Sequence, residues 1–384
     1  MAFTHSRASQ TSCDACGAPR FNANGKPAKQ VTYWYLTSWL THLLSDAIIG
    51  KSMMKNMAAA RKAADEVADG VHDYSHGSNF RHYRSAGLLY HGPFVPVICG
   101  TVGFQFYWQN GFEGWPVTAT PLILSPDQRT RTKYQLLLVV TPVPRQLVDL
   151  ESFLHPIAAE LNELAEGVPG LIVANSPTPV VSRAVVVNFT TDQPGGDKLF
   201  RLTGVSSYMF NRSRLFQGIY APASGHVYFP PKDLRGKSLF TVHDCIVQRR
   251  TVTIIAARAA EVEDARAEGT SVAYQTRLQQ KSGVKGYSLS FAPSPAMRIV
   301  YPHLKHLWTM RPTAAPYDTM HLVLLNVVPH LWKLLAGLKL VNNKKDDHYF
   351  LPKATVAHIG QELREARRPV PLARARSMRY IDIH

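Results

Sequence analysis

The chain has 384 residues, enough for two or three domains or for one core with large insertions. Hydrophobic residues make up 45% and charged residues 18%, a composition that excludes a largely disordered protein. There are 43 Lys and Arg against 27 Asp and Glu, so the formal net charge is +16 at pH 7. This excess favours a polyanionic partner, with nucleic acid the natural candidate, although a diffusely basic surface has the same total charge.

Four cysteines in so long a chain do not form a disulfide scaffold, and the first 13 residues lack the apolar stretch of a secretion signal. We therefore expect an intracellular protein that is not secreted. The apolar stretch 321–341 is interrupted by five polar or helix-breaking residues: Asn326, Pro329, His330, Lys333 and Lys339. Charges at the centre of a bilayer are costly, so we interpret this stretch as a buried amphipathic helix and expect no membrane partner.

The polar N-terminal residues 1–30 contain Cys13 and Cys16, which have the spacing of half a zinc site. A structural zinc ion needs four ligands, and the candidates for the others are distant in sequence: His5, Cys99, His243 and Cys245. The pair is therefore interpreted either as zinc ligands (Zn²⁺) or as free thiols.

Apolar residues recur at helical spacing over 36–67, with Gly50 as the expected break between two helices. The next stretch, 70–92, contains four histidines at irregular intervals. Irregular spacing, with no acidic or cysteine partner close by apart from Asp73, favours a solvated loop over a metal site.

Three stretches dense in β-branched and aromatic residues follow, and their short connections predict an antiparallel meander: 95–107, 115–124 and 133–140. A helix is predicted over 151–166, with Glu160 and Glu163 facing water and Gly167 at its end. The continuous apolar run 183–189 then predicts a central strand with both faces covered.

Beyond the strand, the composition predicts a loop-rich stretch over 204–245, a charged helix over 250–282 and an apolar helix over 318–341. The fold class is α/β (α+β): a meander of three strands, a helix and a central strand, which is how a ribonuclease-H-like core begins. We expect four segments: an N-terminal segment with helices and the half zinc site (1–92), the core (93–205), an insertion (206–317), and an apolar helix with a basic tail (318–384).

Asp192 directly follows the predicted central strand, where α/β enzymes can hold a metal ion. An Asp before x-Pro is also common in turns, so Asp192 is interpreted either as a metal ligand or as a helix cap. Asp197 is expected at a helix cap or on the surface. Asp318 begins the apolar helix and is expected to cap it.

Several motifs in order resemble the transposases of fungal CACTA-type and Kyakuja-Dileera-Zisupton elements. They are Cys13-Asp-Ala-Cys-Gly-Ala-Pro-Arg20, Gly-Phe-Gln-Phe at 103–106 followed by Trp115-Pro-Val117, Ser152-Phe-Leu-His-Pro156, Asp192-Gln-Pro194, and Asp318-Thr-Met-His321 with Asn326. The resemblance runs from about Cys13 to the last residue. It implies an enzyme of the nucleus (or cytoplasm) that cuts and joins double-stranded DNA with two Asp and one Glu around paired Mg²⁺ or Mn²⁺ ions.

Under this resemblance Asp192 is a catalytic metal ligand, and Asp318 and His321 belong to the same catalytic neighbourhood. The family places an Asp before Gly and an aromatic residue on the first strand, where this chain has Val102. An isopropyl group cannot ligate a metal ion, and the family's third carboxylate has no counterpart up to residue 384. We therefore predict a transposase-like protein (DDE class) that is inactive as it stands. The alternatives are a non-catalytic DNA-binding protein and a non-functional remnant of an open reading frame.

Overall fold

The computed structural model describes most of the chain, in these ranges: 8–13, 17–66, 72–87, 89, 92–101, 103–105, 113–143, 150–171, 173–174, 178–204, 207–209, 211–221, 225–228, 249–288, 315–316, 318, 327–337 and 350–367. The chain divides into two compact units, Met1–Pro316 and Tyr317–His384, and each is described by itself. The four segments expected from the sequence stay a prediction.

Two helices open the first unit, α1 (Leu36–Ser45) and α2 (Ile49–Asp65). The prediction of two helices is confirmed, but the break at Gly50 is wrong. The chain turns at Asp46, whose Oδ1 accepts hydrogen bonds from the amides of Ile48 and Ile49 at 2.9 and 2.7 Å. Gly50 lies in the first turn of α2 instead, where an added Cβ would lie 2.8 Å from the carbonyl carbon of Leu44. Glycine is needed here for close approach between the two helices.

The solvated loop expected over 70–92 is wrong as well. The chain forms a short 3-10 helix, η2 (Tyr74–His76), and then α3 (Ser78–Ser85). Phe80 and Tyr83 are three positions apart on α3 and both are buried in the core. These two are the buried residues of this short helix. Two positions among many polar residues are too few to show a helical periodicity in the sequence.

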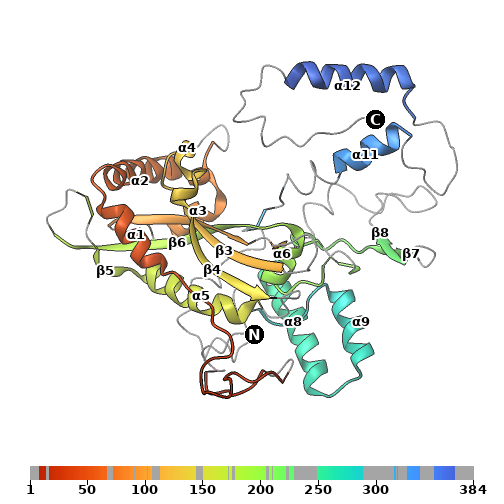
Figure 1. Cartoon of the computed structure of the whole chain (residues 1–384), viewed down its shortest axis with the longest axis horizontal. Helices are drawn as coiled ribbons and strands as arrows, with labels where there is room; N and C mark the ends of the chain where they lie inside the picture. The colour runs from red at the N-terminus through yellow and green to blue at the C-terminus, as the bar shows by residue number, and fades with distance from the viewer. Residues whose placement is uncertain are drawn as a thin grey trace. The chain divides into compact units, whose positions relative to one another are not determined.

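The main sheet contains six strands: β1 (Phe94–Thr101), β2 (Phe104–Gln105), β3 (Glu113–Pro121), β4 (Leu136–Val143), β5 (Val168–Leu171) and β6 (Val180–Thr190). Their order is β2-β3-β1-β6-β5, with β4 also pairing with β3. β1, β3 and β4 form the predicted antiparallel meander, whereas β1 and β6 are parallel. The predicted central strand is confirmed, because β6 lies between β1 and β5 (Figure 1).

The helix predicted over 151–166 is α5 (Glu151–Glu166), which follows β4 and precedes β5 along the chain. Gly167 ends it with φ 109, as expected for a glycine after a helix. In Figure 1, α5 lies on one face of the sheet and α3 on the other. This arrangement covers both faces of β6 and explains why its residues from Ala184 to Val187 are all buried.

Glu160 on α5 corrects a prediction, because its side chain is buried and does not face water. Its carboxylate accepts hydrogen bonds from the amides of Leu36 and Thr37, at 3.0 and 2.8 Å, and from the hydroxyl of Tyr33. It therefore satisfies the free amides at the start of α1, a role that negative charge favours at a helix N-terminus. Glu163, one turn later, is exposed as predicted.

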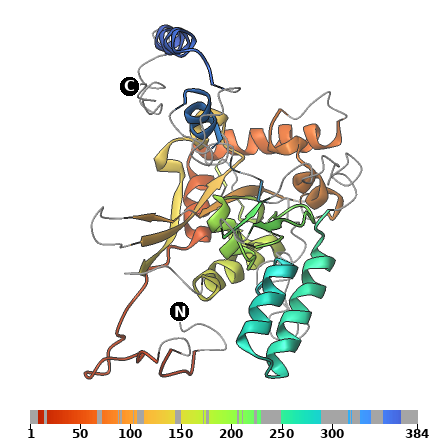
Figure 2. The ribbon, with the colours of Figure 1, turned by 90° about the vertical axis from the view of Figure 1, so that its right-hand side faces the viewer.

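After the sheet come α6 (Gln193–Leu199) and a small hairpin of β7 (Ile219–Ala221) and β8 (His226–Tyr228). The single charged helix expected over 250–282 is two helices, α8 (Val252–Ala267) and α9 (Val272–Ser282), which lie side by side in Figures 1 and 2. The break contains Gly269 with φ +67, and Ser271 caps α9 by accepting from the amide of Tyr274.

The second unit contains α11 (Val328–Leu335) and α12 (Lys353–Arg367). The expected helix over 318–341 is described only in part, and no residue of α11 is buried, so the prediction of a buried helix is wrong for this part. Within the described ranges, no helix has both the length and the apolar character that crossing a membrane requires. The Arg-rich end beyond Arg367 lies outside the described residues.

Candidate functional site at the carboxyl ends of β1 and β6

The candidate site lies where two parallel neighbouring strands end. Gly100 on β1 pairs with Thr190 on β6, so the carboxyl ends of both strands reach the same edge of the sheet. The chain leaves β6 through Thr191 and Asp192 and immediately begins α6. Ligand sites in open α/β sheets are found at such edges, outside the carboxyl ends of the strands.

Asp192 occupies the N-cap position of α6. Its Oδ1 accepts a hydrogen bond from the amide of Gly195 at 2.7 Å, and the side chain is half-buried. The second carboxylate oxygen makes no hydrogen bond with any residue in the described ranges. The capping role expected as one alternative is thus present, and one oxygen remains for a further ligand.

The start of α6 packs closely against the end of β1. A Cβ added to Gly195 would lie 2.8 Å from Oδ1 of Asp192 and 3.0 Å from the carbonyl oxygen of Thr101, and would collide with the hydroxyl of Thr191. Only glycine allows the helix to begin this near to β1. Val102 lies outside the described residues, so its expected position opposite Asp192 stays a prediction.

A lysine and a tryptophan lie together on one side of the site. Lys198 on α6 places its Nζ 4.1 Å from the ring centroid of Trp115 on β3, a distance suited to a cation–π interaction. A Cβ on Gly103 would lie 2.6 Å from Cζ2 of the same tryptophan, so glycine lets the ring lie flat against the chain. The sequence analysis missed Lys198; its signal was the position six residues after Asp192, on the same short helix.

Asp197 lies on α6 with its side chain buried, which corrects the expectation of a cap or a surface position. Nε2 of Gln193 donates a hydrogen bond to Oδ1 of Asp197 at 2.8 Å. Burial raises the pKa of Asp197 to about 7, and the charges of Arg212, Lys285 and Arg250, with the Gln193 hydrogen bond, act in the opposite direction. Gln193 and Asp197 are four positions apart on one face of α6, whereas Asp192 is five positions from Asp197 and lies on another.

Arg212 is among the most buried side chains of the protein, with 2% of its surface exposed. It approaches α6 at Gly196, where an added Cβ would lie 3.2 Å from Cζ of the guanidinium. Sequence reasoning missed Arg212 because nothing distinguishes it from Arg214, two residues later in the same loop-rich stretch. It contributes positive charge inside the protein beside the candidate site.

The other predicted site residues stay predictions. Asp318 belongs to the second unit, and His321 lies outside the described residues. Cys13 is half-buried, and Cys16 lies outside the described residues. Where residues are described, no group of three or more His, Cys, Asp or Glu is arranged to hold a metal ion.

Cys99, a suggested additional zinc ligand, is buried on β1 with 1% of its surface exposed. Burial raises the pKa of its thiol to about 12. A zinc ligand must be a thiolate, so Cys99 is poorly suited to that role. The remaining suggested ligands, His5, His243 and Cys245, lie outside the described residues.

No protein-family model matches this chain, and no curated protein matches it. The features that bear on its function are the strand order, the edge where β1 and β6 end, and the distribution of charge.

Proposed function

We propose that this protein is a transposase-like DNA-binding protein whose main sheet, α5 and α6 form a ribonuclease-H-like core, and that it does not cleave DNA as it stands. The observation that carries this proposal is the strand arrangement. Three antiparallel strands in the order β1, β3, β4 are followed by a helix, by the short edge strand β5, and by β6, which is parallel to β1. An Asp at the carboxyl end of β6 occupies the place where such a core holds a metal ligand.

Cleavage by two metal ions requires several carboxylate oxygens around the pair, because Mg²⁺ and Mn²⁺ prefer oxygen ligands. The described residues do not fit such a site. Asp192 has one oxygen engaged in capping α6, and Asp197 on the same helix is directed toward buried arginines. With valine at position 102, the sequence offers no first-strand carboxylate as a partner.

The charge of the chain supports DNA as the partner. The formal net charge of +16 favours a polyanion, because basic side chains that contact phosphates release condensed counterions. In this proposal the protein binds double-stranded DNA and does not cleave it.

The test of the lost metal site compares Val102→Asp with the uncharged, similarly sized Val102→Asn in the full chain. We expect Mn²⁺ to bind more tightly to Val102→Asp than to the wild type or to Val102→Asn, as measured by calorimetric titration. Adding Asp192→Asn to Val102→Asp should abolish this gain. Equal Mn²⁺ affinity in all the variants would mean that positions 102 and 192 do not share a site, and the core assignment would fail.

A parallel assay measures nicking of supercoiled plasmid in Mg²⁺ or Mn²⁺. We expect no nicking by the unaltered chain, and duplex binding that weakens steeply as salt rises. Metal-dependent nicking by the wild type that Asp192→Asn removes would refute the proposed loss of activity. Absence of any duplex binding at low salt would refute the proposed DNA-binding function.

A further inference from the structure

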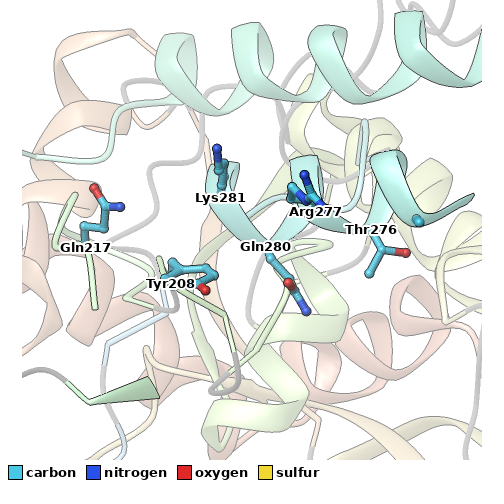
Figure 3. Close-up of a pocket in the computed structure, with 7 residues that line it drawn as sticks. Tyr208, Gln217, Thr276, Arg277, Gln280 and Lys281 are labelled. Atoms are coloured by element: carbon cyan, nitrogen blue, oxygen red, sulfur yellow. The ribbon is translucent and has the colours of Figure 1, made fainter. Parts of the chain in front are cut away.

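A pocket of about 590 Å³ lies in the first unit, on other elements than those that carry Asp192. It is formed by one side of α9 and by two residues of the preceding loop segments, as Figure 3 shows. Its polar lining residues are Tyr208, Gln217, Thr276, Arg277, Gln280 and Lys281. Most of them are exposed, so the pocket opens directly to solvent.

The lining has the chemistry of an anion site. It combines two cations with amide and hydroxyl donors, and no acidic residue is among the lining residues. Arg277 and Lys281 are four positions apart on α9, where like charges lie side by side and destabilise a helix. Lys281 is favoured by the helix dipole in the last turn, but α9 contains no acidic residue that could offset the pair. A bound anion would remove this repulsion.

The walls of the pocket are fixed to each other by internal hydrogen bonds. Ser207 donates from its hydroxyl to the carbonyl of Gln280 at 3.0 Å, joining the loop to α9. Arg250, with 2% of its surface exposed, donates to the carbonyls of Met209 and Ser282 at 3.0 and 3.2 Å. The site is therefore formed before any ligand binds, which reduces the entropy lost on binding.

We propose that this pocket binds a backbone phosphate of a nucleic-acid strand. The planar guanidinium of Arg277 suits two phosphate oxygens, Lys281 adds a second charge, and Gln280 adds an amide donor to the lining. Tyr208 supplies an aromatic ring at the edge, as in sites that contact nucleic-acid strands. This proposal rests on the proposed DNA binding but not on any metal chemistry.

The test replaces both cations in the full chain, Arg277→Gln with Lys281→Gln. The matched control is Lys51→Gln with Lys55→Gln, because these lysines are also exposed and four positions apart, on α2. Duplex affinity is measured by fluorescence anisotropy at several salt concentrations. Each lost phosphate contact lowers the salt slope by about 0.9, so we expect the pocket variant, which loses one contact, to have a slope lower by about 0.9 and to bind on the order of eightfold more weakly near 0.1 M salt. The control should keep the wild-type slope.

A second pair of variants adds charge without removing any. Gln280→Glu places a carboxylate in the pocket, whereas Gln279→Glu makes the same change one position earlier on α9, outside the lining. We expect Gln280→Glu to weaken duplex binding severalfold more than Gln279→Glu. Circular dichroism and thermal unfolding check that all variants fold alike.

Three outcomes would overturn the proposal. Equal loss of slope in the pocket and control variants would assign DNA binding to diffuse surface charge. An unchanged duplex slope together with weaker binding of inorganic phosphate, measured by calorimetry, would show that the pocket takes free phosphate instead. Unchanged binding of both ligands would show that it is no anion site. By contrast, a wild type that binds no DNA at all would refute the proposed function itself.

Discussion

Oδ1 of Asp192 lies 2.7 Å from the amide nitrogen of Gly195, and this hydrogen bond joins the end of β6 to the beginning of α6. The carboxylate therefore has a structural role that does not require a metal ion. Capping alone accounts for an Asp at this edge of the sheet.

Replacing Asp192 by alanine should lower the free energy of unfolding by about 1 kcal/mol, the usual loss on removing a helix cap. Asn also accepts a hydrogen bond at an N-cap, so Asp192→Asn should stay close to the wild type. Urea unfolding followed by circular dichroism measures both. If alanine and asparagine are equally harmless, the cap contributes nothing, and a role in binding would be the stronger reason for an Asp at this position.

Glu160 offers a second test, because it receives three donors at the beginning of α1. In Glu160→Gln the side chain keeps one acceptor oxygen but presents an amide group to the remaining donors. Leaving a buried donor unsatisfied costs about 1–3 kcal/mol, so we expect a loss of this size in the free energy of unfolding.

The matched control for Glu160 is Glu163→Gln, an exposed position on the same helix. Exposed substitutions of this kind usually change stability by less than about 0.5 kcal/mol. If the two variants lost similar amounts of unfolding free energy, the loss would come from the changed net charge of α5. That result would contradict the capping role of Glu160.

The parts of the fold that follow from local pattern could be predicted from the sequence. The bounds of α5 follow from its 3.6-residue periodicity and from Gly167, and β6 follows from its continuous apolar run. The antiparallel pairing of β1, β3 and β4 follows from short connections. Each of these features depends on residues close together in the chain.

The wrong predictions concern polar residues whose hydrogen-bond or charge partners are distant in the sequence. Glu160 was expected to face water because its partners, at the start of α1, are more than a hundred residues earlier. Asp197 was expected near the surface because its pattern does not reveal that Arg212 and Arg250 fold around α6. A polar residue on a helix is buried when tertiary partners satisfy it, and only the fold brings those partners together.

Asp197 makes stability depend on pH. Burial raises its pKa to about 7, whereas an unfolded Asp titrates near 3.9. Between about pH 4 and about pH 7 the folded state therefore binds more protons than the unfolded state, and the free energy of unfolding falls as pH rises. Above about pH 7 this contribution is constant.

Asp197→Asn removes the titrating group while keeping its shape. Relative to this variant, we expect the wild type to lose up to roughly 4 kcal/mol of unfolding free energy across that pH range. Urea titrations at several pH values measure the difference. Asp65→Asn is the control: the hydrogen bond from Arg84 lowers the pKa of that exposed carboxyl, so its contribution to stability is constant between about pH 4 and pH 7 and is lost only at lower pH. A constant difference between the wild type and Asp197→Asn would mean that Asp197 is ionised throughout.

Cys99 reports whether β1 is as well covered as its burial indicates. Burial raises the pKa of this thiol to about 12, so at ordinary pH it is neutral and shielded from reagents. Under native conditions iodoacetamide should leave Cys99 unmodified in peptide mass spectra and should modify it after unfolding in urea.

Cys13, which is half-buried, should react without unfolding. If zinc binds at Cys13 and Cys16, zinc should protect Cys13 and leave Cys99 unchanged. Rapid native modification of Cys99 would show that β1 is open to solvent, and the sheet edge where Asp192 lies would then lack its rigid support.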